Sequence, residues 1–377
     1  MSNHAQARSW IEVNPSALRS NYEAVRARAG ARTAIIPMVK ADGYGLGAAW
    51  VVRTLGPLGP WGFGVATAAE GAFLRDQGIR LPIVVFSPLS EDALEQAARQ
   101  RLTAAVSDLA ALKRWAALAS QSDPLDFHLE IDTGMGRAGF DWRETGVWAE
   151  PVHALCSERV RWTGVYTHFF SADAADRGGT ARQWERFRDA IGQLPVSPEN
   201  LMVHASNSAA AMRWPEYAGD AVRPGIFLYG GHPAPGVEDV PAPEAVASVH
   251  SQVVLVRNVP PGSTLGYGAT HIARGPEIWA TLGLGYGDGW PRNLGNRGFA
   301  IVRGERVRIV GRISMDMTVV DVTGIAGVRS GDEAILIGRS GDEEITVDEV
   351  AQRADTISYE ILTGFTPRLP RQERANG

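Results

Sequence analysis

The chain has 377 residues, of which 45% are hydrophobic and 21% charged, and its net charge is -5. These values are typical of a globular protein large enough for two domains, or for one barrel with an appendage. The acidic balance offers no basic stripe for nucleic acid, and no run of eighteen apolar residues suits a membrane helix. We therefore expect a cytoplasmic protein that binds neither nucleic acid nor membranes, with its single cysteine, Cys156, outside any internal disulfide.

Residues 34–230 alternate short apolar, β-branched runs with helical patterns such as 90–100. Such alternation predicts βα units around a parallel sheet. Eight candidate strands occur, so their number predicts an α/β fold with an N-terminal (β/α)8 barrel over residues 1–238. The candidate strands are 34–40, 63–68, 81–87, 102–107, 127–132, 162–168, 201–206 and 222–230.

The stretch 230–245 is rich in Pro and Gly and has no periodicity, so it is expected to be a linker. From about residue 247 short β-like runs are broken by Gly-rich turns, without intervening helices. These runs predict a C-terminal all-β domain over residues 239–377. A first strand at about 9–13 is a further candidate member of that β domain.

Active sites of (β/α)8 barrels lie at the C-terminal ends of the strands. Several residues whose side chains could take part in catalysis or binding occupy such places. Arg223 is the exception, because it lies near the start of the eighth run, which indicates that the predicted start of that strand is too early. In the fifth run, alternation puts His128, Glu130 and Asp132 on one face, as expected for a barrel interior that holds a polar ligand. The residues at strand ends are Lys40, Arg137, His168, Asn207 and Ser208.

Only two of the 37 basic residues are lysines, Lys40 and Lys113. Lys113 lies in a pattern typical of an amphipathic helix, on the side expected to face solvent. Lys40 closes an apolar run, where a purely solvating role would be unusual. Schiff-base chemistry requires an amine that can lose its proton, which arginine cannot do. Lys40 is therefore a candidate for covalent catalysis.

The segment VKADGYGLG (39–47) resembles the cofactor-lysine signature of the alanine racemase family. Further strings that resemble the family follow in the family's order over nearly the whole chain. They are DTGMGRAGF (132–140), THFFSAD (167–173), NSAA (207–210), VRPGIFLYG (222–230), LGYGATHIA (265–273), LGYGDGWPR (284–292), GRISMDMTVVDV (311–322) and SYEILTGFTPR (358–368). The resemblance implies a fold-type III enzyme that uses pyridoxal 5'-phosphate (PLP) to interconvert L- and D-alanine, for peptidoglycan or for alanine catabolism.

Racemisation removes a proton from one face of the amino-acid Cα and returns it to the other, while PLP delocalises the charge. The resemblance implies that Lys40 holds PLP and serves one face. It also implies that Tyr267 serves the other face from the partner chain of a homodimer, with His168 as its helper. Arg223 would lie against the pyridine nitrogen of PLP. Because a guanidinium keeps its proton, that nitrogen would stay unprotonated and PLP would be a weaker electron sink.

The resemblance also implies which residues hold the cofactor and the substrate, without any metal. For PLP these are Tyr44, Asn207, Ser208, Gly225, Ile226 and Tyr359, in addition to Lys40 and Arg223. For the substrate they are Arg137, Met315, Tyr286 and Asp316. A narrow entrance would be formed by Asp173, Tyr286, Arg292 and Arg312.

Two positions depart from the family pattern. Ser314 stands where many relatives carry Cys. Glu130 stands where many carry a lysine that reacts with carbon dioxide to become an anionic carbamate. We expect the Glu130 carboxylate to orient Arg137 in place of that carbamate.

Three alternatives compete with this interpretation. A decarboxylase of the same fold type predicts a catalytic Cys in the C-terminal domain, where this chain has none. A PLP carrier protein predicts a barrel alone. A racemase of another amino acid, such as serine or a basic residue, stays open.

Overall fold

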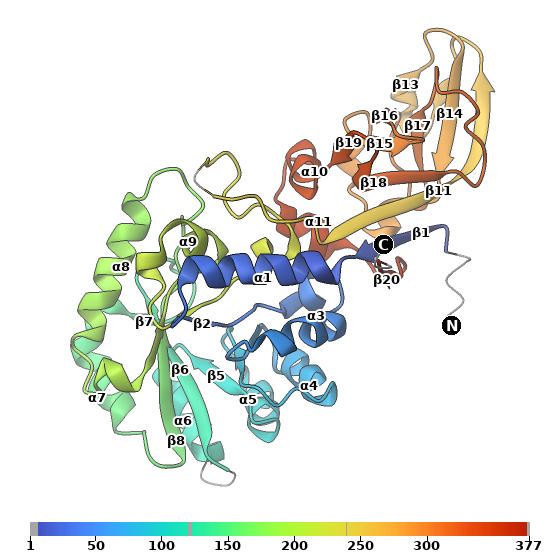
Figure 1. Ribbon diagram of the computed structural model, residues 1–377. Helices are drawn as coiled ribbons and strands as arrows, with labels where there is room; N and C mark the ends of the chain where they lie inside the picture. The colour runs from blue at the N-terminus through green and yellow to red at the C-terminus, as the bar shows by residue number, and fades with distance from the viewer. Residues whose placement is uncertain (1–6, 120–122, 239, 375–377) are drawn as a thin grey trace.

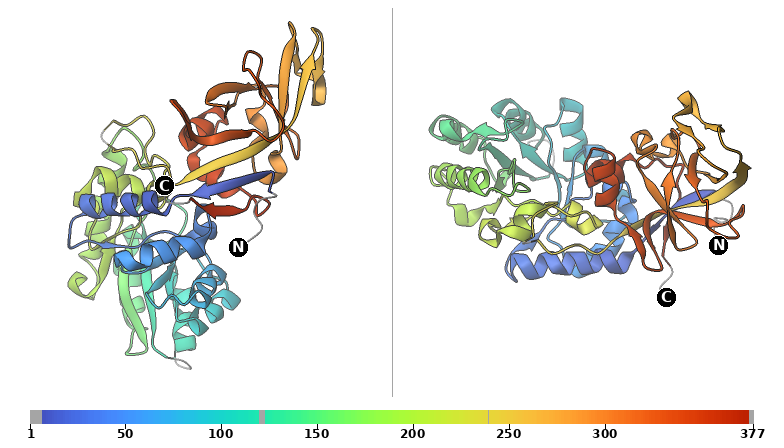
Figure 2. Two further views of the ribbon diagram at one scale, coloured as in Figure 1. Left: turned by 45° about the vertical axis from the view of Figure 1, so that its right-hand side comes forward. Right: turned by 90° about the horizontal axis from the view of Figure 1, so that it is seen from above.

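The computed structural model describes residues 7–119, 123–238 and 240–374. The chain forms two lobes, an α/β barrel and a smaller lobe built mostly of strands (Figure 1). Two further views show the same division, with helix α1 (Pro15–Ala29) lying along the barrel toward the second lobe (Figure 2). None of the helices in these residues has the length and apolar character that a bilayer crossing requires.

The described residues of the first lobe form a barrel of eight parallel strands in the order β2-β10-β9-β8-β6-β5-β4-β3. A parallel bridge between Met38, just after β2, and Gly64 in β3 joins the two ends of this order. The predicted barrel is therefore confirmed, and each predicted run from the first to the seventh overlaps a strand. The strands are β2 (Ala34–Ile35), β3 (Phe63–Val65), β4 (Ile83–Val85), β5 (Thr103–Val106), β6 (Leu125–Asp132), β8 (Val160–Tyr166), β9 (Met202–His204) and β10 (Ala221–Val222).

Helices surround this barrel because each one buries an apolar face against the strands. In α6, for example, Leu112 and Trp115 are fully buried while Lys113 is exposed, as predicted. The helices after α1 are α3 (Ala48–Leu55), α4 (Ala68–Asp76), α5 (Glu91–Arg99), α6 (Leu109–Ala119), α7 (Thr145–His153), α8 (Gly178–Ile191) and α9 (Ser208–Arg213).

The predicted eighth strand, 222–230, is wrong in its extent. Strand β10 ends at Val222, and Ile226–Tyr229 form a 3-10 helix. Pro224 has no N–H for a strand ladder, and the apolar residues after it are buried, so the segment resembles a buried strand in sequence. Arg223 therefore follows the C-terminal end of its strand, as an active-site residue of this fold should.

The second lobe contains a closed ring of six strands among the described residues, with neighbours in the order β11-β14-β17-β16-β15-β18 and β18 pairing back to β11. Strand β1 (Ser9–Val13) adds to this sheet, antiparallel to β11 and parallel to β20 (Arg371–Glu373). The candidate strand at 9–13 is therefore confirmed as part of the β lobe. The ring strands are β11 (Ala247–Val259), β14 (Glu277–Leu282), β15 (Phe299–Val302), β16 (Glu305–Ile309), β17 (Thr318–Asp321) and β18 (Glu333–Ser340).

The prediction that this lobe lacks helices is wrong. It carries α10 (Val347–Arg353) and α11 (Ser358–Gly364), each only seven residues long and therefore weak in periodicity. Helix α10 begins at Thr346, whose side chain accepts a hydrogen bond from Glu349 N. The domain division at 238 and 239 stays a prediction.

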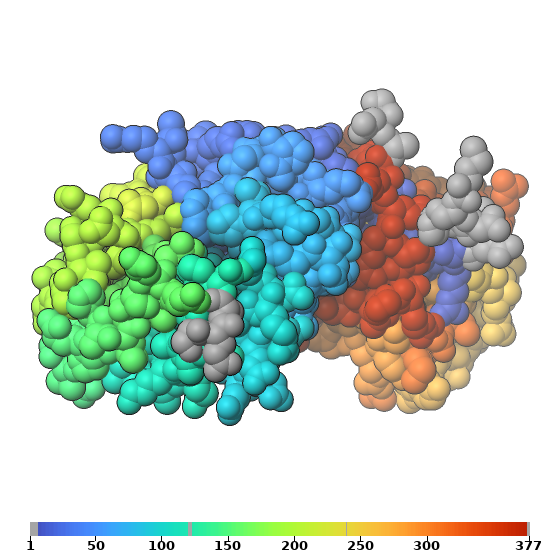
Figure 3. All heavy atoms as spheres, turned by 90° about the horizontal axis from the view of Figure 1, so that it is seen from below, coloured from blue at the N-terminus to red at the C-terminus, as the bar shows by residue number. Residues whose placement is uncertain are grey.

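Residues near the C-terminal end join the second lobe to the barrel. In the space-filling view the red C-terminal residues lie directly beside the blue N-terminal half of the barrel (Figure 3). Arg371 donates to the carbonyl oxygen of Gly45 from Nε (3.0 Å) and Nη2 (2.7 Å). A side chain at Gly45 would collide with the carbonyl of Leu362 in α11. The two lobes are thus in close backbone contact beside Lys40 and Tyr44.

Candidate active site

A cavity of about 120 Å³ lies at the C-terminal ends of the barrel strands. It brings together nine residues expected at the cofactor or substrate from the sequence. It is lined by Lys40, Tyr44, Arg137, His168, Asn207, Ser208, Arg223, Gly225 and Tyr359, together with Met38, Phe86, Glu130 and Tyr166.

Five expected residues do not line this cavity within one chain: buried Ile226 of the barrel and four residues of the second lobe. Tyr267, Tyr286 and Met315 lie on the second lobe and are exposed by 67%, 40% and 53%. Asp316 is bound to Arg368 (2.7 Å) and lies 3.6 Å from Arg8. Aromatic and thioether side chains exposed to this extent leave apolar surface for another chain to cover.

Lys40 opens an unusual turn, α2 (Lys40–Tyr44). Ala41, Asp42 and Gly43 have φ values of 51°, 53° and 61° and ψ values near those of a left-handed helix. Each non-glycine residue in that conformation costs roughly 1–2 kcal/mol. Such strain persists only where surrounding contacts hold it, and it gathers at functional sites. The turn places Lys40 and Tyr44 at the same cavity.

The environment of Lys40 favours its neutral amine. Lys40 is exposed in this single chain, yet desolvation at the cavity still lowers its pKa, and the neighbouring guanidinium of Arg137 lowers it further. A neutral amine is the form that acts as a nucleophile and as a base. The site therefore prepares Lys40 for both roles.

Arg223 is the centre of a buried network. Its Nη1 donates to His204 Nδ1 (2.7 Å), and its Nη2 donates to the carbonyl oxygens of Thr167 (2.9 Å) and Ala205 (3.0 Å). His204 Nε2 lies 2.9 Å from His128 Nδ1. Since an arginine only donates, His204 Nδ1 must be the acceptor, and Nε2 carries the hydrogen that it donates to His128.

His168 also faces Arg223, with Nδ1 3.3 Å from Nη2. Burial, with Arg223 and Arg137 nearby, lowers the pKa of His168 to about 3. Its ring is therefore neutral at physiological pH, with Nδ1 as the acceptor and Nε2 as the donor. Burial lowers the pKa of Arg223 itself to about 10, which leaves the guanidinium charged.

Other residues that line the cavity can accept a phosphate. Ser208 Oγ lies 2.7 Å from Gly225 N, and the N–H of Ile226 has no acceptor among the described residues. Tyr44 is buried and stacked on Tyr229 at 4.4 Å, with no room for a side chain at Gly225 beside its hydroxyl. Hydroxyls and free backbone amides are suitable phosphate ligands.

Arg223 also lines the cavity, and its Nε donates to no protein acceptor in the part of the chain that the structure describes. A donor therefore remains for the ring nitrogen of a cofactor. Together with an amine at Lys40, these groups fit PLP.

The expected ion pair between Glu130 and Arg137 is absent from the described residues, where no carboxylate lies within 4.0 Å of Arg137. Glu130 Oε2 instead accepts from Ser107 Oγ at 3.1 Å. Burial raises the pKa of Glu130, and Tyr166, Ser107 and the charge of Arg137 lower it. Strand β6 directs Glu130 into the barrel, whereas Arg137 follows in a loop with its side chain exposed.

Sequence reasoning missed His204 and Tyr166. His204 is fully buried between Tyr166, stacked at 5.1 Å, and the edge of Phe86. Tyr166 is the last residue of β8, and the predicted strand 162–168 puts it two positions before His168, so alternation indicated that both side chains share a face. His204 alternates with Val203 and Ala205 in the same way. Polar residues at alternate positions in apolar strands were the available signal.

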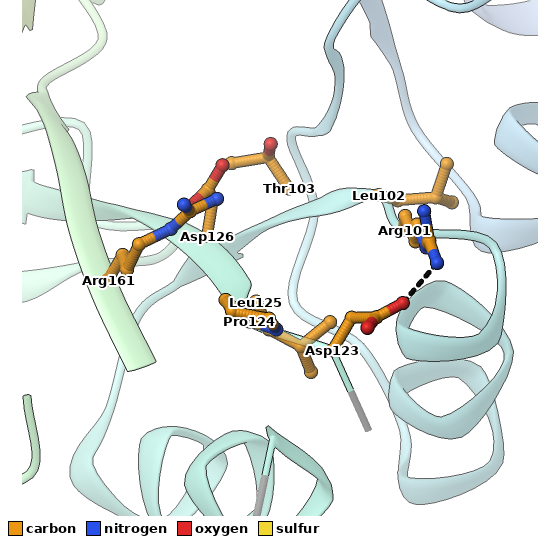
Figure 4. A pocket seen from close by; sticks show the side chains of 8 residues that line it. All are labelled: Arg101, Leu102, Thr103, Asp123, Pro124, Leu125, Asp126 and Arg161. Atoms are coloured by element: carbon orange, nitrogen blue, oxygen red, sulfur yellow. Dashed lines mark hydrogen bonds and ion pairs between the residues drawn. The ribbon is translucent and has the colours of Figure 1, made fainter. Parts of the chain in front are cut away.

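A larger cavity, of about 340 Å³, lies at the opposite end of the barrel, where β5, β6 and β8 begin (Figure 4). Its charged side chains are paired, Arg101 with Asp123 and Arg161 with Asp126 (2.6 Å). Features at this end of a barrel serve stability rather than catalysis.

Comparison with known families settles the assignment. Residues 13–233 match the alanine racemase N-terminal domain, and residues 246–373 match the alanine racemase C-terminal domain. The chain belongs to the alanine racemase family. The enzyme is 38% identical to an alanine racemase of Carboxydothermus hydrogenoformans, over 96% of this chain and 98% of that protein. It is 36% identical to one of Halothermothrix orenii, over 97% and 96%.

Solved structures agree with these relatives. An alanine racemase of Streptomyces coelicolor has a TM-score of 0.91 and 32% identity, covering 100% of both chains. One of Bacillus anthracis, solved with bound L-Ala-P, has a TM-score of 0.91 and 31% identity, covering 98% of this chain and 96% of that one. The enzyme is thus a PLP-dependent isomerase that interconverts L- and D-alanine.

Proposed function

We propose that the enzyme racemises alanine with two bases, Lys40 of one subunit and Tyr267 of the partner. The observation that carries this proposal is the cavity, which Lys40 lines but which Tyr267, the other expected base, does not line within one chain. Tyr267 is 67% exposed on the second lobe, and a second subunit is needed to bring it to such a cavity. The enzyme is therefore proposed to be a homodimer with shared sites.

PLP supplies an electron sink for the charge that develops at the substrate Cα. Lys40 holds the cofactor and then moves a proton at Nζ on one face. The Tyr267 hydroxyl moves the proton on the other face. His168 supports Tyr267, because its Nε2–H is free to donate to the phenolic oxygen and so to stabilise its charged form.

Arg223 is proposed to donate to the ring nitrogen. Tyr44, Ser208, Tyr359 and the amides of Gly225 and Ile226 would hold the phosphate, with Asn207 beside them.

Arg137, with Met315 and Tyr286 of the partner, would receive the substrate carboxylate. Asp316 contributes by positioning, since Arg368 and Arg8 already bind its carboxylate. The residues Asp173, Arg292 and Arg312 are proposed for the entrance. The product would supply peptidoglycan synthesis or alanine catabolism in the cytoplasm.

Hybrid dimers test this proposal. Tyr267→Phe and Lys40→Ala dimers should each be nearly inactive, with Tyr267→Phe lowered by about two to four orders of magnitude. After subunit exchange, half of the dimers carry one intact site, so racemase activity should return to about a quarter of the wild-type value. No recovery after verified exchange would contradict the shared site. A panel of L- and D-amino acids assayed with the wild type defines the substrate range.

A further inference from the structure

Glu70 connects helix α4 to the residue that follows Lys40. Its Oε2 accepts from Ala66 N (2.8 Å) and Thr67 N (3.1 Å), which belong to the start of its own helix. Its Oε1 accepts from Ala41 N at 2.7 Å. The bond from Thr67 N belongs to a capping box, in which Thr67 Oγ1 also accepts from Glu70 N, and the bond from Ala66 N adds to it. The bond to Ala41 lies outside that motif and crosses to a segment 29 residues earlier.

The backbone of Ala41 is in a strained conformation, which a hydrogen bond from outside the turn can stabilise. Ala41 has a φ of 51° and carries a Cβ, so the left-handed conformation is strained at this position. Within the turn, Asp42 Oδ1 accepts from Ala48 N (2.8 Å) and Gly45 N donates to Ala41 O (2.7 Å). The amide of Ala41 itself is bound only by Glu70 among the described residues. A carboxylate acceptor makes this bond charge-assisted.

We propose that Glu70 is a positioning residue for Lys40, holding the strained turn that directs Lys40 and Tyr44 into the cavity. The inference rests on the proposed role of Lys40 in holding the cofactor. Glu70 does not line the cavity, so it acts through the backbone of the turn. Its negative charge also raises the pKa of Lys40, against the larger lowering caused by burial and Arg137.

Two variants separate this role from helix capping. Glu70→Gln has the same shape but offers one acceptor oxygen, so it cannot serve α4 and Ala41 together. Thr67→Ala removes the other half of the capping box and leaves the bond to Ala41 intact. Both should loosen α4 to a similar extent, and only Glu70→Gln should loosen residues 40–47. Glu70→Asp is a third test variant. It keeps the negative charge, but its shorter side chain does not reach Ala41.

The readouts are hydrogen exchange of residues 40–47 measured by mass spectrometry, PLP affinity, and kcat and KM separately. Glu70→Gln and Glu70→Asp should exchange about tenfold faster in 40–47, bind PLP more weakly and lose kcat with little change in KM. Thr67→Ala should keep wild-type values for all of these.

Two results would overturn the inference. One is equal behaviour of Thr67→Ala and Glu70→Gln. The other is wild-type exchange in 40–47 for both Glu70 variants. If the proposed role of Lys40 is wrong instead, the wild-type protein will not link PLP at Lys40, whatever the exchange of 40–47 shows.

Discussion

The Nη1 of Arg223 lies 2.7 Å from Nδ1 of His204, and both side chains are buried inside the barrel. Among the described residues, the guanidinium of Arg223 has no carboxylate partner. It donates instead to the carbonyl oxygens of Thr167 and Ala205 and to the neutral imidazole of His204. Burial, with Arg223 nearby, holds the pKa of His204 well below its usual range, so the ring remains an acceptor. The charge of Arg223 is thus not cancelled by His204 and stays available for its proposed contact with the cofactor.

Replacing His204 should impair the placement of Arg223. His204→Leu removes the acceptor at Nδ1, and the lost bond to a charged group predicts a fall in kcat/KM of about one to two orders of magnitude. His204→Asn, whose Oδ1 can stand near the position of Nδ1, should recover part of that loss. Steady-state kinetics in both directions measure the effect. Equal kinetics for His204→Leu and the wild type would contradict it.

The buried histidines should make the enzyme sensitive to acid. The pKa of His128 and the pKa of His168 are each about 3 in the folded chain, whereas an unfolded histidine titrates near 6.5. Between these values only the unfolded chain takes up the proton. Each group therefore contributes stability that is complete above about pH 6.5 and is lost as pH falls toward 3. The slope is about 1.4 kcal/mol per pH unit for each group.

Urea unfolding from pH 7 to 4.5 measures that slope. His128→Asn should make the decline shallower by about 1.4 kcal/mol per pH unit. His153→Asn, at the exposed end of α7, is the control and should leave the slope unchanged. An unchanged slope for His128→Asn would show that His128 does not remain neutral on folding.

Lys40 should be the residue that carries PLP. Borohydride reduction of the wild-type enzyme, followed by peptide mass mapping, should find the cofactor on Lys40 and none on Lys113. Lys113 is exposed on α6, far from the barrel strands' C-terminal ends, and serves as an internal control. Lys40→Ala should lose the visible absorbance of the linked cofactor. Modification of Lys113 instead would overturn the assignment.

Glu130 should influence Arg137 through its charge, since the two form no ion pair. Glu130→Gln should weaken substrate binding or turnover, and wild-type activity should not depend on added bicarbonate. Because burial raises the pKa of Glu130, the wild type should approach the variant as pH falls through that raised value. Ser107→Ala, which keeps the charge, is the matched control. Unchanged kinetics for Glu130→Gln across a pH series would refute the hypothesis.

Local pattern predicted the barrel well because parallel strands buried on both faces appear as short apolar runs. The same rule failed after Val222, where buried residues form a 3-10 helix rather than a strand. Helix α11, which carries Tyr359, was missed because seven residues give too little periodicity.

Long-range contacts of the site were also beyond local pattern. A capping box predicts that Glu70 binds its own helix start, but nothing near Glu70 in sequence indicates Ala41. The network of Arg223, His204 and His128 joins β6, β9 and the residue that follows β10 in the same way. The proposed role of Tyr267 involves a second subunit, which the local pattern of one chain does not describe.

Strand β1 has a consequence for how the molecule is made. Its partners β11 and β20 follow more than two hundred residues later in the chain, with Ile11 N bonded to Pro370 O at 3.0 Å. The sheet of the second lobe is therefore incomplete on the ribosome until β20 has emerged. Contacts between such distant segments also slow folding. A fragment that begins at residue 246 would expose the open edge of β11, a template for aggregation.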